Sequence, residues 1–314
     1  MRVIFMGTPD FVVPVLDALV DSQDAEVVGV YTPPDRPRGR GRSPEMPPVK
    51  ARALSLELPV HQTASLRSAR VQEELASRQP DVIVVAAYGR LLPSRVLDLP
   101  HRGCLNLHPS LLPRYRGPSP VITTILEGDP ITGVTLMQLD EGMDTGPIIA
   151  QREHPVAPDD TAETLTRSLF KLGADLLLGN LHPWVEGQLA ARPQDDAQAT
   201  VTRKLERRDG EADWRLSAIE LERRQRAYTP WPGLFTRWRD QVLKLVEVTA
   251  LPASTASDNE TPGTVAALQL AESPVGVVTG NGVLGLKALQ LEGRRVTTAQ
   301  EFVRGYPQFV GSRL

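Results

Sequence analysis

The segment Asp81–Ala87 constrains the fold of this chain more than any other. It reads DVIVVAA, a run rich in β-branched residues without the apolar–polar alternation of a half-exposed strand. Strands of a parallel sheet stay apolar throughout because helices cover both faces of the sheet. The run therefore predicts a central parallel strand. Since parallel neighbours need crossover connections, we expect helices between the strands on either side of it.

The chain around this strand alternates as a parallel sheet requires. Apolar runs predict further strands at Arg2–Met6, Glu26–Tyr31, near Val60, Gly103–Leu107, Gly133–Gln138 and Pro147–Gln151. Helical spacing predicts helices that end near Val20 or span 49–57, 67–78 and Thr161–Glu186. Together these elements predict a doubly wound, mostly parallel Rossmann-like α/β sheet. Ligands of such sheets bind beyond the C-terminal strand ends, which places Gly7, Tyr88 and Asn106–His108 along one rim.

The last third of the chain has a different pattern. Residues 191–203 are polar, lack an apolar period and are expected to form a linker. A helix with a basic face is predicted at Trp214–Tyr228. Short apolar runs follow at Leu234–Trp238, Gln241–Val248, Gly263–Leu270, Val275–Thr279 and Val283–Gln290. Because short strands with glycine turns are typical of a small barrel, we expect a catalytic domain at 1–190 and an OB-like β-barrel domain at 204–314.

Composition is that of an ordinary globular protein, with 41% hydrophobic and 23% charged residues and a net charge of −3. The one cysteine, Cys104, cannot form an intrachain disulfide, which fits a reducing compartment. No run approaches the roughly 18 apolar residues of a membrane helix, and the N-terminus lacks the apolar core of a signal peptide. We therefore expect a cytoplasmic monomer without a membrane partner.

Asn106 and His108 are the first candidate catalytic residues. They stand two apart at the end of a predicted strand, so their side chains share a face. An amide beside an imidazole suits a reaction that develops charge on a carbonyl oxygen, because the amide holds the oxyanion and the imidazole handles a proton. A buried pair that fixes the following proline-rich turn is the alternative interpretation.

The segment 138–146, QLDEGMDTG, is the second candidate. Its two glycines and three acidic residues predict a tight loop between apolar strands. Asp144 has small or flexible neighbours and is placed to orient a histidine or a water. Aspartate and glycine are equally common in hairpin turns, and that interpretation stays open.

Basic segments offer contacts for a polyanion. Residues 35–42, DRPRGRGR, combine guanidinium groups for phosphate with glycines that permit close approach. Residues 32–48 include six prolines, so we expect a loop without regular secondary structure. The loop is either functional or simply a solvated, mobile segment. Arginines also flank Tyr115 and precede Trp231, which suits RNA contacts. Trp231 and Trp238 are nevertheless expected in the core of the second domain.

The sequence lacks the motifs of several other classes of enzyme. The first turn, GTPDF, has a single glycine and does not match the nicotinamide-binding G-x-G-x-x-G turn. The chain carries neither a P-loop nor a G-x-S-x-G nucleophile motif. Its five histidines lack metal-ligand spacing, and one cysteine cannot build a zinc site, so we expect no metal requirement.

Taken together, these segments resemble the folate-dependent formyltransferase family over nearly the whole chain. The resembling segments are FMGTPDF at 5–11, DRPRGRGR at 35–42, AAYGRLLP at 86–93, LNLHPSLLPRYRG at 105–117, TGVTLMQLDEGMDTG at 132–146 and RAYTPWPG at 226–233. The arginine loop and RAYTPWPG resemble the branch that acts on initiator tRNA. The smaller glycinamide ribonucleotide branch shares the Asn-x-His segment but lacks a C-terminal domain.

The resemblance implies transfer of the formyl group of 10-formyltetrahydrofolate to the α-amine of methionine on initiator methionyl-tRNA. It implies that Asn106 holds the formyl oxygen, His108 stabilises the charge or acts as acid or base, and Asp144 orients His108 or a water. The implied folate-binding residues are Ser110, Leu111, Leu112, Pro113, Ala87, Tyr88, Gly89, Arg90, Gln138 and Asp140. The implied tRNA-binding residues are Arg36, Arg38, Arg40 and Arg42, aided by the basic second domain.

Other functions remain open at this point. An amino-sugar nucleotide formyltransferase also carries Asn106, His108 and Asp144 in this pattern and a small C-terminal domain, and it would be indifferent to tRNA. A non-catalytic folate- or RNA-binding protein would bind without turnover, which the intact trio argues against. A nicotinamide oxidoreductase is disfavoured by the first turn.

Overall fold

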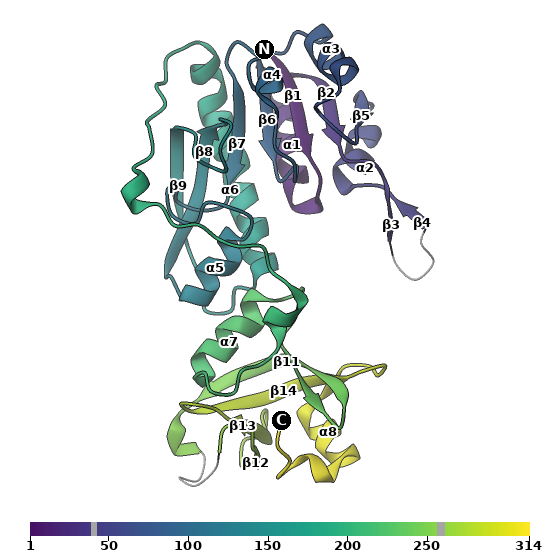
Figure 1. Ribbon diagram of the computed structural model, residues 1–314, viewed down its shortest axis with the longest axis vertical. Coiled ribbons are helices and arrows are strands. Elements are labelled where there is room, and N and C mark those ends of the chain that lie inside the picture. The colour runs from purple at the N-terminus through teal and green to yellow at the C-terminus, as the bar shows by residue number, and fades with distance from the viewer. Residues whose placement is uncertain (39–42, 256–260) are drawn as a thin grey trace. The chain divides into compact units, whose positions relative to one another are not determined.

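The first sheet has seven strands in the order β5-β2-β1-β6-β7-β8-β9 (Figure 1). The structure, a computed structural model, describes residues 1–38, 43–255 and 261–314. The strands are β1 (Arg2–Gly7), β2 (Glu26–Thr32), β5 (Val60–Gln62), β6 (Val82–Ala86), β7 (Cys104–His108), β8 (Ile131–Gln138) and β9 (Ile148–Pro155). From β5 to β7 all neighbours are parallel, whereas β8 and β9 are antiparallel. The predicted mostly parallel α/β sheet is confirmed.

Helices cover both faces of this sheet because its inner strands are apolar on both sides. Val3 and Phe5 of β1 face α1 (Val13–Asp21), α2 (Pro48–Ser55) and α6 (Ala162–Val185). Ile4 and Met6 face the opposite side, with α3 (Ala69–Ser77) and α4 (Ser94–Leu97). Every residue of β6 is buried, as its unbroken apolar sequence predicts.

The strand order reverses next to β1. The chain passes from β1 outward to β2 and β5, then returns to place β6 on the other side of β1. The loops after β1 and β6 therefore leave toward opposite faces, which opens a crevice at their carboxyl ends. Gly7, Ala87 and His108 all stand at this rim, at the ends of β1, β6 and β7.

The second sheet is an antiparallel half-barrel, with strand order β10-β11-β14-β13-β12 and β15 paired to β14. Its elements are β10 (Phe235–Trp238), β11 (Gln241–Leu251), β12 (Val265–Ala267), β13 (Val275–Val278), β14 (Val283–Leu291), β15 (Thr297–Thr298), α7 (Ala218–Ala227) and α8 (Ala299–Gly305). Trp238 packs edge-on against Phe302, Tyr306 and Phe309, which confirms its place in the core.

Two details of this second part differ from expectation. Trp231 is 55% exposed, so its predicted burial is wrong; it stands between two prolines in the turn after α7, outside the strands that build the core. The helix α7 begins at Ala218 rather than Trp214. Ser217 and Glu220 form a capping box that starts it there.

The proline-rich segment 32–48 also differs, because it contains two short strands. β3 (Arg36–Arg38) and β4 (Ser43–Glu45) pair antiparallel, with Pro37 opposite Pro44. The two residues without an amide hydrogen thus share one rung of an isolated two-stranded ribbon, where both strands are edges and tolerate proline. The expectation of no regular structure is therefore wrong.

The chain divides into two compact units. One comprises Met1–Pro120, Pro130–Val156 and Thr164–Arg203; the other comprises Val121–Asp129, Ala157–Glu163 and Lys204–Leu314. The helix α5 (Pro120–Glu127) thus lies mostly in the second unit. The domain limits at 190 and 204 stay a prediction. Within the described ranges, no helix combines the length and the apolarity needed to cross a membrane.

The placement of Cys104 gives the first prediction. Its side chain is 1% exposed in β7, and burial raises the pKa of its thiol well above the usual range. Because the thiolate is the reactive form, we expect an aromatic disulfide reagent to label none of the native protein and one thiol per chain in guanidinium chloride. Labelling of the native protein at the rate of the unfolded chain would contradict this placement.

Candidate active site

Asn106 and His108 lie on the same face of β7, as their spacing predicts. Leu105 and Leu107 alternate with them along the strand and point into the core beneath the opposite face. His108 is 4% exposed, while the Asn106 side chain is half-buried. Within the described residues the Asn106 amide has no hydrogen-bond partner, so the amide is available to a ligand at the rim.

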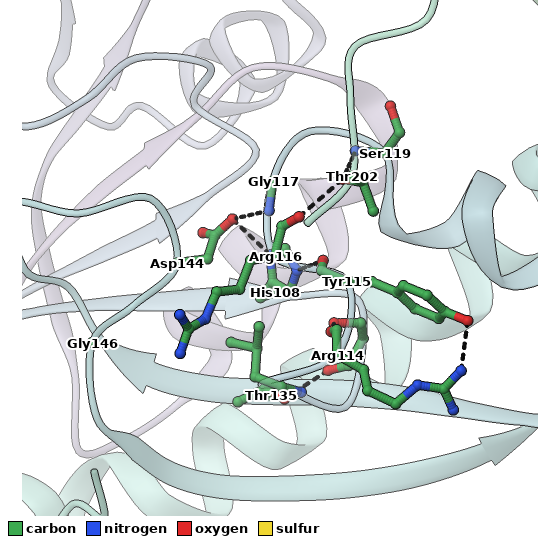
Figure 2. Close-up of polar contacts among 12 residues, drawn as sticks. His108, Arg114, Tyr115, Arg116, Gly117, Ser119, Thr135, Asp144, Gly146 and Thr202 are labelled. Atoms are coloured by element: carbon green, nitrogen blue, oxygen red, sulfur yellow. Dashed lines mark hydrogen bonds and ion pairs between the residues drawn. The ribbon is translucent and has the colours of Figure 1, made fainter. Parts of the chain in front are cut away.

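Both ring nitrogens of His108 face an acceptor. Nε2 lies 2.9 Å from the carbonyl oxygen of Tyr115, which only accepts, so Nε2 carries the hydrogen. Nδ1 lies 3.6 Å from Oδ2 of Asp144 (Figure 2). A protonated ring therefore directs both of its N–H groups toward oxygen atoms. This arrangement suits a cation beside a site of developing negative charge.

A backbone amide holds the Asp144 carboxylate in place. The Gly117 N–H donates to Oδ2 of Asp144 at 2.8 Å, the same oxygen that faces His108. Gly117 has a φ of +101°, where an L side chain is strained, and a Cβ there would lie 2.8 Å from the Thr202 carbonyl oxygen. The loop after β7 and the loop before β9 therefore meet at Asp144.

Asp140 organises the rest of the loop that carries Asp144. Its carboxylate accepts from the Gly142 N–H at 3.0 Å and from the Thr145 hydroxyl at 2.8 and 2.9 Å. Gln138 at the end of β8 bonds through its backbone N–H to the Pro147 carbonyl at 2.9 Å. Asp140 thus fixes the conformation of this loop. The loop is a tight turn, as predicted, and it also carries Asp144 to the site.

Residues 110–113 pack onto β8. The Ser110 hydroxyl donates to the Arg114 carbonyl at 2.7 Å, and the Thr135 hydroxyl donates to the Ser110 carbonyl at 2.6 Å. Leu111 lies against Gly133, where a Cβ would come within 2.5 Å of a leucine methyl. Leu112 joins a small apolar cluster with Met137 and Ile148, and Pro113 follows it through a cis bond.

The residues Ala87–Arg90 line a different feature, a cavity of about 570 Å³. It lies at the carboxyl ends of β1, β2 and β6, where sheets of this kind bind ligands. Its lining residues are Thr8, Pro9, Pro33, Pro34, Arg36, Glu45, Met46, Pro47, Pro48, Ala87, Tyr88, Gly89 and Arg90. Five of these residues are prolines, whose rings fix φ and restrict the backbone of the wall. The trio and residues 110–113 do not line it.

The predicted basic residues are only partly placed. Arg36 lines the cavity, and the backbone of Arg38 belongs to β3. Arg40 and Arg42 lie outside the described residues. On α7, Arg223 donates to the Glu127 carbonyl and Arg226 to the Asp160 carbonyl, both within the second unit. These two arginines are engaged inside the protein.

Sequence reasoning missed the role of Arg116 and Gln194. Arg116 is 7% exposed and reaches Gln194 and Asp196 rather than solvent. Arg114 instead stacks on the Tyr115 ring, 4.8 Å from its centroid. No local pattern marks Gln194, because its partners are far away in sequence. In the described part of the chain no cluster of three or more His, Cys, Asp or Glu residues forms a metal site.

Two profiles of known protein families match this chain. A family profile described as "Formyl transferase" matches residues 1–181, more than half of the chain. The chain belongs to the formyl transferase family. A second profile, "Formyl transferase, C-terminal domain", matches residues 204–307, so both parts of the chain resemble this family.

Relatives within the family include proteins of the same length. The curated methionyl-tRNA formyltransferase of Roseiflexus castenholzii is 46% identical over 314 residues, with 100% of this chain and 99% of that protein covered.

Solved structures share the fold. HypX from Aquifex aeolicus in complex with tetrahydrofolic acid superposes with a TM-score of 0.66 at 19% identity, covering 99% of this chain and 48% of HypX. The N-formyltransferase from Helicobacter canadensis, with folinic acid and dTDP-3-aminofucose, gives a TM-score of 0.63 at 17% identity, covering 91% of this chain and 99% of that one.

The approach of Gly117 to Thr202 predicts the effect of a methyl group at this position. Gly117→Ala should lower the free energy of unfolding by about 1–3 kcal/mol, because the positive φ is strained and the methyl group meets a carbonyl oxygen. Gly179→Ala in α6 is the matched control, since a Cβ at Gly179 has no neighbour within 4 Å. We expect the control to be neutral or stabilising by up to about 1 kcal/mol. Urea unfolding measures both, and equal effects would contradict the described turn.

Proposed function

We propose that this chain transfers the formyl group of 10-formyltetrahydrofolate to the α-amine of methionine on initiator methionyl-tRNA, in the cytoplasm, for translation initiation. The observation that carries the proposal is the 46% identity, over the whole chain, to a protein named methionyl-tRNA formyltransferase. The juxtaposed Asn106, His108 and Asp144 supply the chemistry. The monomeric state expected from the sequence stays a prediction.

Formyl transfer makes a bond from the amine nitrogen to the formyl carbon and breaks the bond from that carbon to N10 of the folate. The carbonyl electron pair moves onto oxygen and returns when the bond to N10 breaks. One proton leaves the amine and one reaches N10, so the reaction is balanced without an oxidant or reductant. The expectation that no metal is required stays a prediction. What the protein must supply is a donor for the oxyanion and a route for the proton.

Asn106 and His108 supply these functions in the proposal. The Asn106 amide, without a partner among the described residues, donates to the formyl oxygen as negative charge develops there. The His108 ring stands on the same face of β7 and stabilises that charge or transfers the proton. Asp144, 3.6 Å from the ring, orients His108 or a water that carries the proton. The Gly117 amide keeps the Asp144 carboxylate facing the ring.

Two stretches of backbone are proposed to hold the folate. Ala87–Arg90 line the cavity at the end of β6, and Arg90 is held there by the Thr63 and Ala64 carbonyls. Ser110–Pro113 present apolar side chains above β8, and Gln138 and Asp140 shape the adjoining loop. Because the Ser110 hydroxyl and the Asp140 carboxylate already bond within their own turns, we propose that both act by shaping the backbone.

The tRNA is proposed to contact two basic features. One is the loop with Arg36, Arg38, Arg40 and Arg42. The other is the turn at Arg207–Gly210 in the second unit, which lies against the turn after Trp231, since a Cβ on Gly210 would be 2.1 Å from the Gly233 carbonyl oxygen. Trp231, Arg207 and Arg208 are all exposed, which supports base stacking combined with phosphate contacts.

The first test is turnover with 10-formyltetrahydrofolate and charged initiator methionyl-tRNA, beside an amino-sugar nucleotide and a reaction without acceptor. We expect formylation of the tRNA alone. His108→Ala should lower kcat by about 10²-fold or more. His101→Ala is the matched control, since the His101 side chain is 62% exposed in the turn before β7. Formylation of the sugar nucleotide would show that the proposed tRNA acceptor is wrong. Full activity of His108→Ala would show that His108 has no part in the mechanism.

The arginine loop gives a separate test. Arg40→Ala should raise the KM for tRNA and reduce the slope of binding against salt concentration by about 1, as loss of one phosphate contact requires. Arg52→Ala removes the same charge from α2, where Arg52 pairs with Asp17, and serves as control. Equal KM values for the Arg40 variant and the wild type would exclude a contact from Arg40 to the tRNA.

A further inference from the structure

The segment 191–203 connects the loop after β7 to the loop that carries Asp144. At one end, Arg192 exchanges two backbone hydrogen bonds with Ile148 of β9, at 2.7 and 2.8 Å. At the other end, the Arg116 N–H donates to the Thr200 carbonyl at 2.9 Å. The Thr202 N–H donates to the Arg116 carbonyl at 2.7 Å; Figure 2 shows Arg116 and Thr202 side by side. The segment therefore joins the loop after β7 to the strand that follows the Asp144 loop.

Gln194 is the side chain at the centre of this connection. Its Nε2 donates to the Asp144 carbonyl at 2.8 Å and to the Gly146 carbonyl at 2.7 Å. Its Oε1 accepts from Nε of Arg116 at 3.0 Å. The amide thus uses both of its donors on one loop and its acceptor on the other, a combination that neither glutamate nor methionine can reproduce.

Arg116 completes the connection on the side of His108. Its guanidinium is buried, and Nη2 donates to Asp196 at 2.7 Å. The residues before and after Arg116 in the sequence contact His108 and Asp144. The Tyr115 carbonyl accepts from His108, and the Gly117 N–H donates to Asp144. A displacement of Arg116 therefore moves a partner of His108 and a partner of Asp144.

The Asp144 backbone is held in an unusual conformation. Its φ is +56°, a left-handed value that costs free energy for a residue with a side chain, so surrounding contacts must stabilise it. Gln194 bonds to the Asp144 carbonyl itself and to Gly146 two residues on. Loss of these bonds frees the residue whose carboxylate faces His108 at 3.6 Å.

We infer that Gln194, through Arg116, is a positioning residue for formyl transfer: it sets the separation and alignment of Asp144 and His108 without touching either substrate. The inference rests on the proposed function and deepens it. Misplacement of a catalytic group by about 1 Å costs roughly 10²-fold in rate, so a side chain that holds both loops affects kcat more than substrate binding.

The test compares Gln194→Glu with the wild type. Glutamate keeps an acceptor for Arg116 but replaces the donor to the Asp144 and Gly146 carbonyls with a repelling oxygen. We expect kcat to fall by about 10-fold or more while the KM values for folate and tRNA change less than about twofold. Gln198→Ala is the matched control. Gln198 is an exposed glutamine four residues on, and among the described residues its side-chain amide bonds to Asp195 alone. If Gln194→Glu does not fold, Gln194→Met removes the same donors at similar volume.

A second readout separates positioning from general stability. In protein labelled with ¹⁵N-histidine, the ring nitrogen signals of His108, assigned by their loss in His108→Ala, should shift in the Gln194 variant and not in Gln198→Ala. Unchanged His108 signals, or an unchanged kcat per folded molecule, would overturn the inference. Absence of turnover by the wild type would instead overturn the proposed function, while the histidine spectra still report on the alignment.

Discussion

The burial of β6 on both faces is the constraint on which the rest of the structure depends. Each of its five residues is buried, so helices must cover the sheet on both sides and the strand must lie at its centre. The chain reaches that place by returning past β1, and the strand order reverses there. The crevice at the carboxyl ends of β1 and β6 follows from this reversal, as do the cavity there and the rim on which His108 stands.

At this rim the same hydrogen bonds satisfy buried polar groups and orient the candidate catalytic side chains. The loop after β7 turns back over the sheet, and its buried polar groups need partners. His108 is the partner of the Tyr115 carbonyl, and Asp144 is the partner of the Gly117 amide. The segment 191–203 supplies the partner of the Arg116 guanidinium. The bonds that satisfy the turn therefore also orient the side chains that would carry a proton or stabilise charge.

Much of the fold and part of the site could be predicted because they depend on short sequence patterns. The strands of the first sheet follow from apolar runs, and the shared face of Asn106 and His108 follows from the period of a strand. Where the predictions were wrong, the tertiary context overrode the usual preference of the residue type. Prolines at 37 and 44 are tolerated because they oppose each other in an isolated ribbon, and Trp231 is exposed because its turn lies outside the barrel strands.

What the sequence by itself determined is the set of elements, their order in a parallel sheet, the resemblance to the formyl transferases and the candidate trio. Each depends on residues within a few positions of one another, or on motifs whose order along the chain is informative. Only the tertiary structure decided which polar groups pair across the site. Gln194 bonds to Arg116, 78 residues earlier in the chain, and to Asp144, 50 residues earlier. No periodicity or spacing encodes such a contact, because the packing of the whole sheet brings the two loops to the same place.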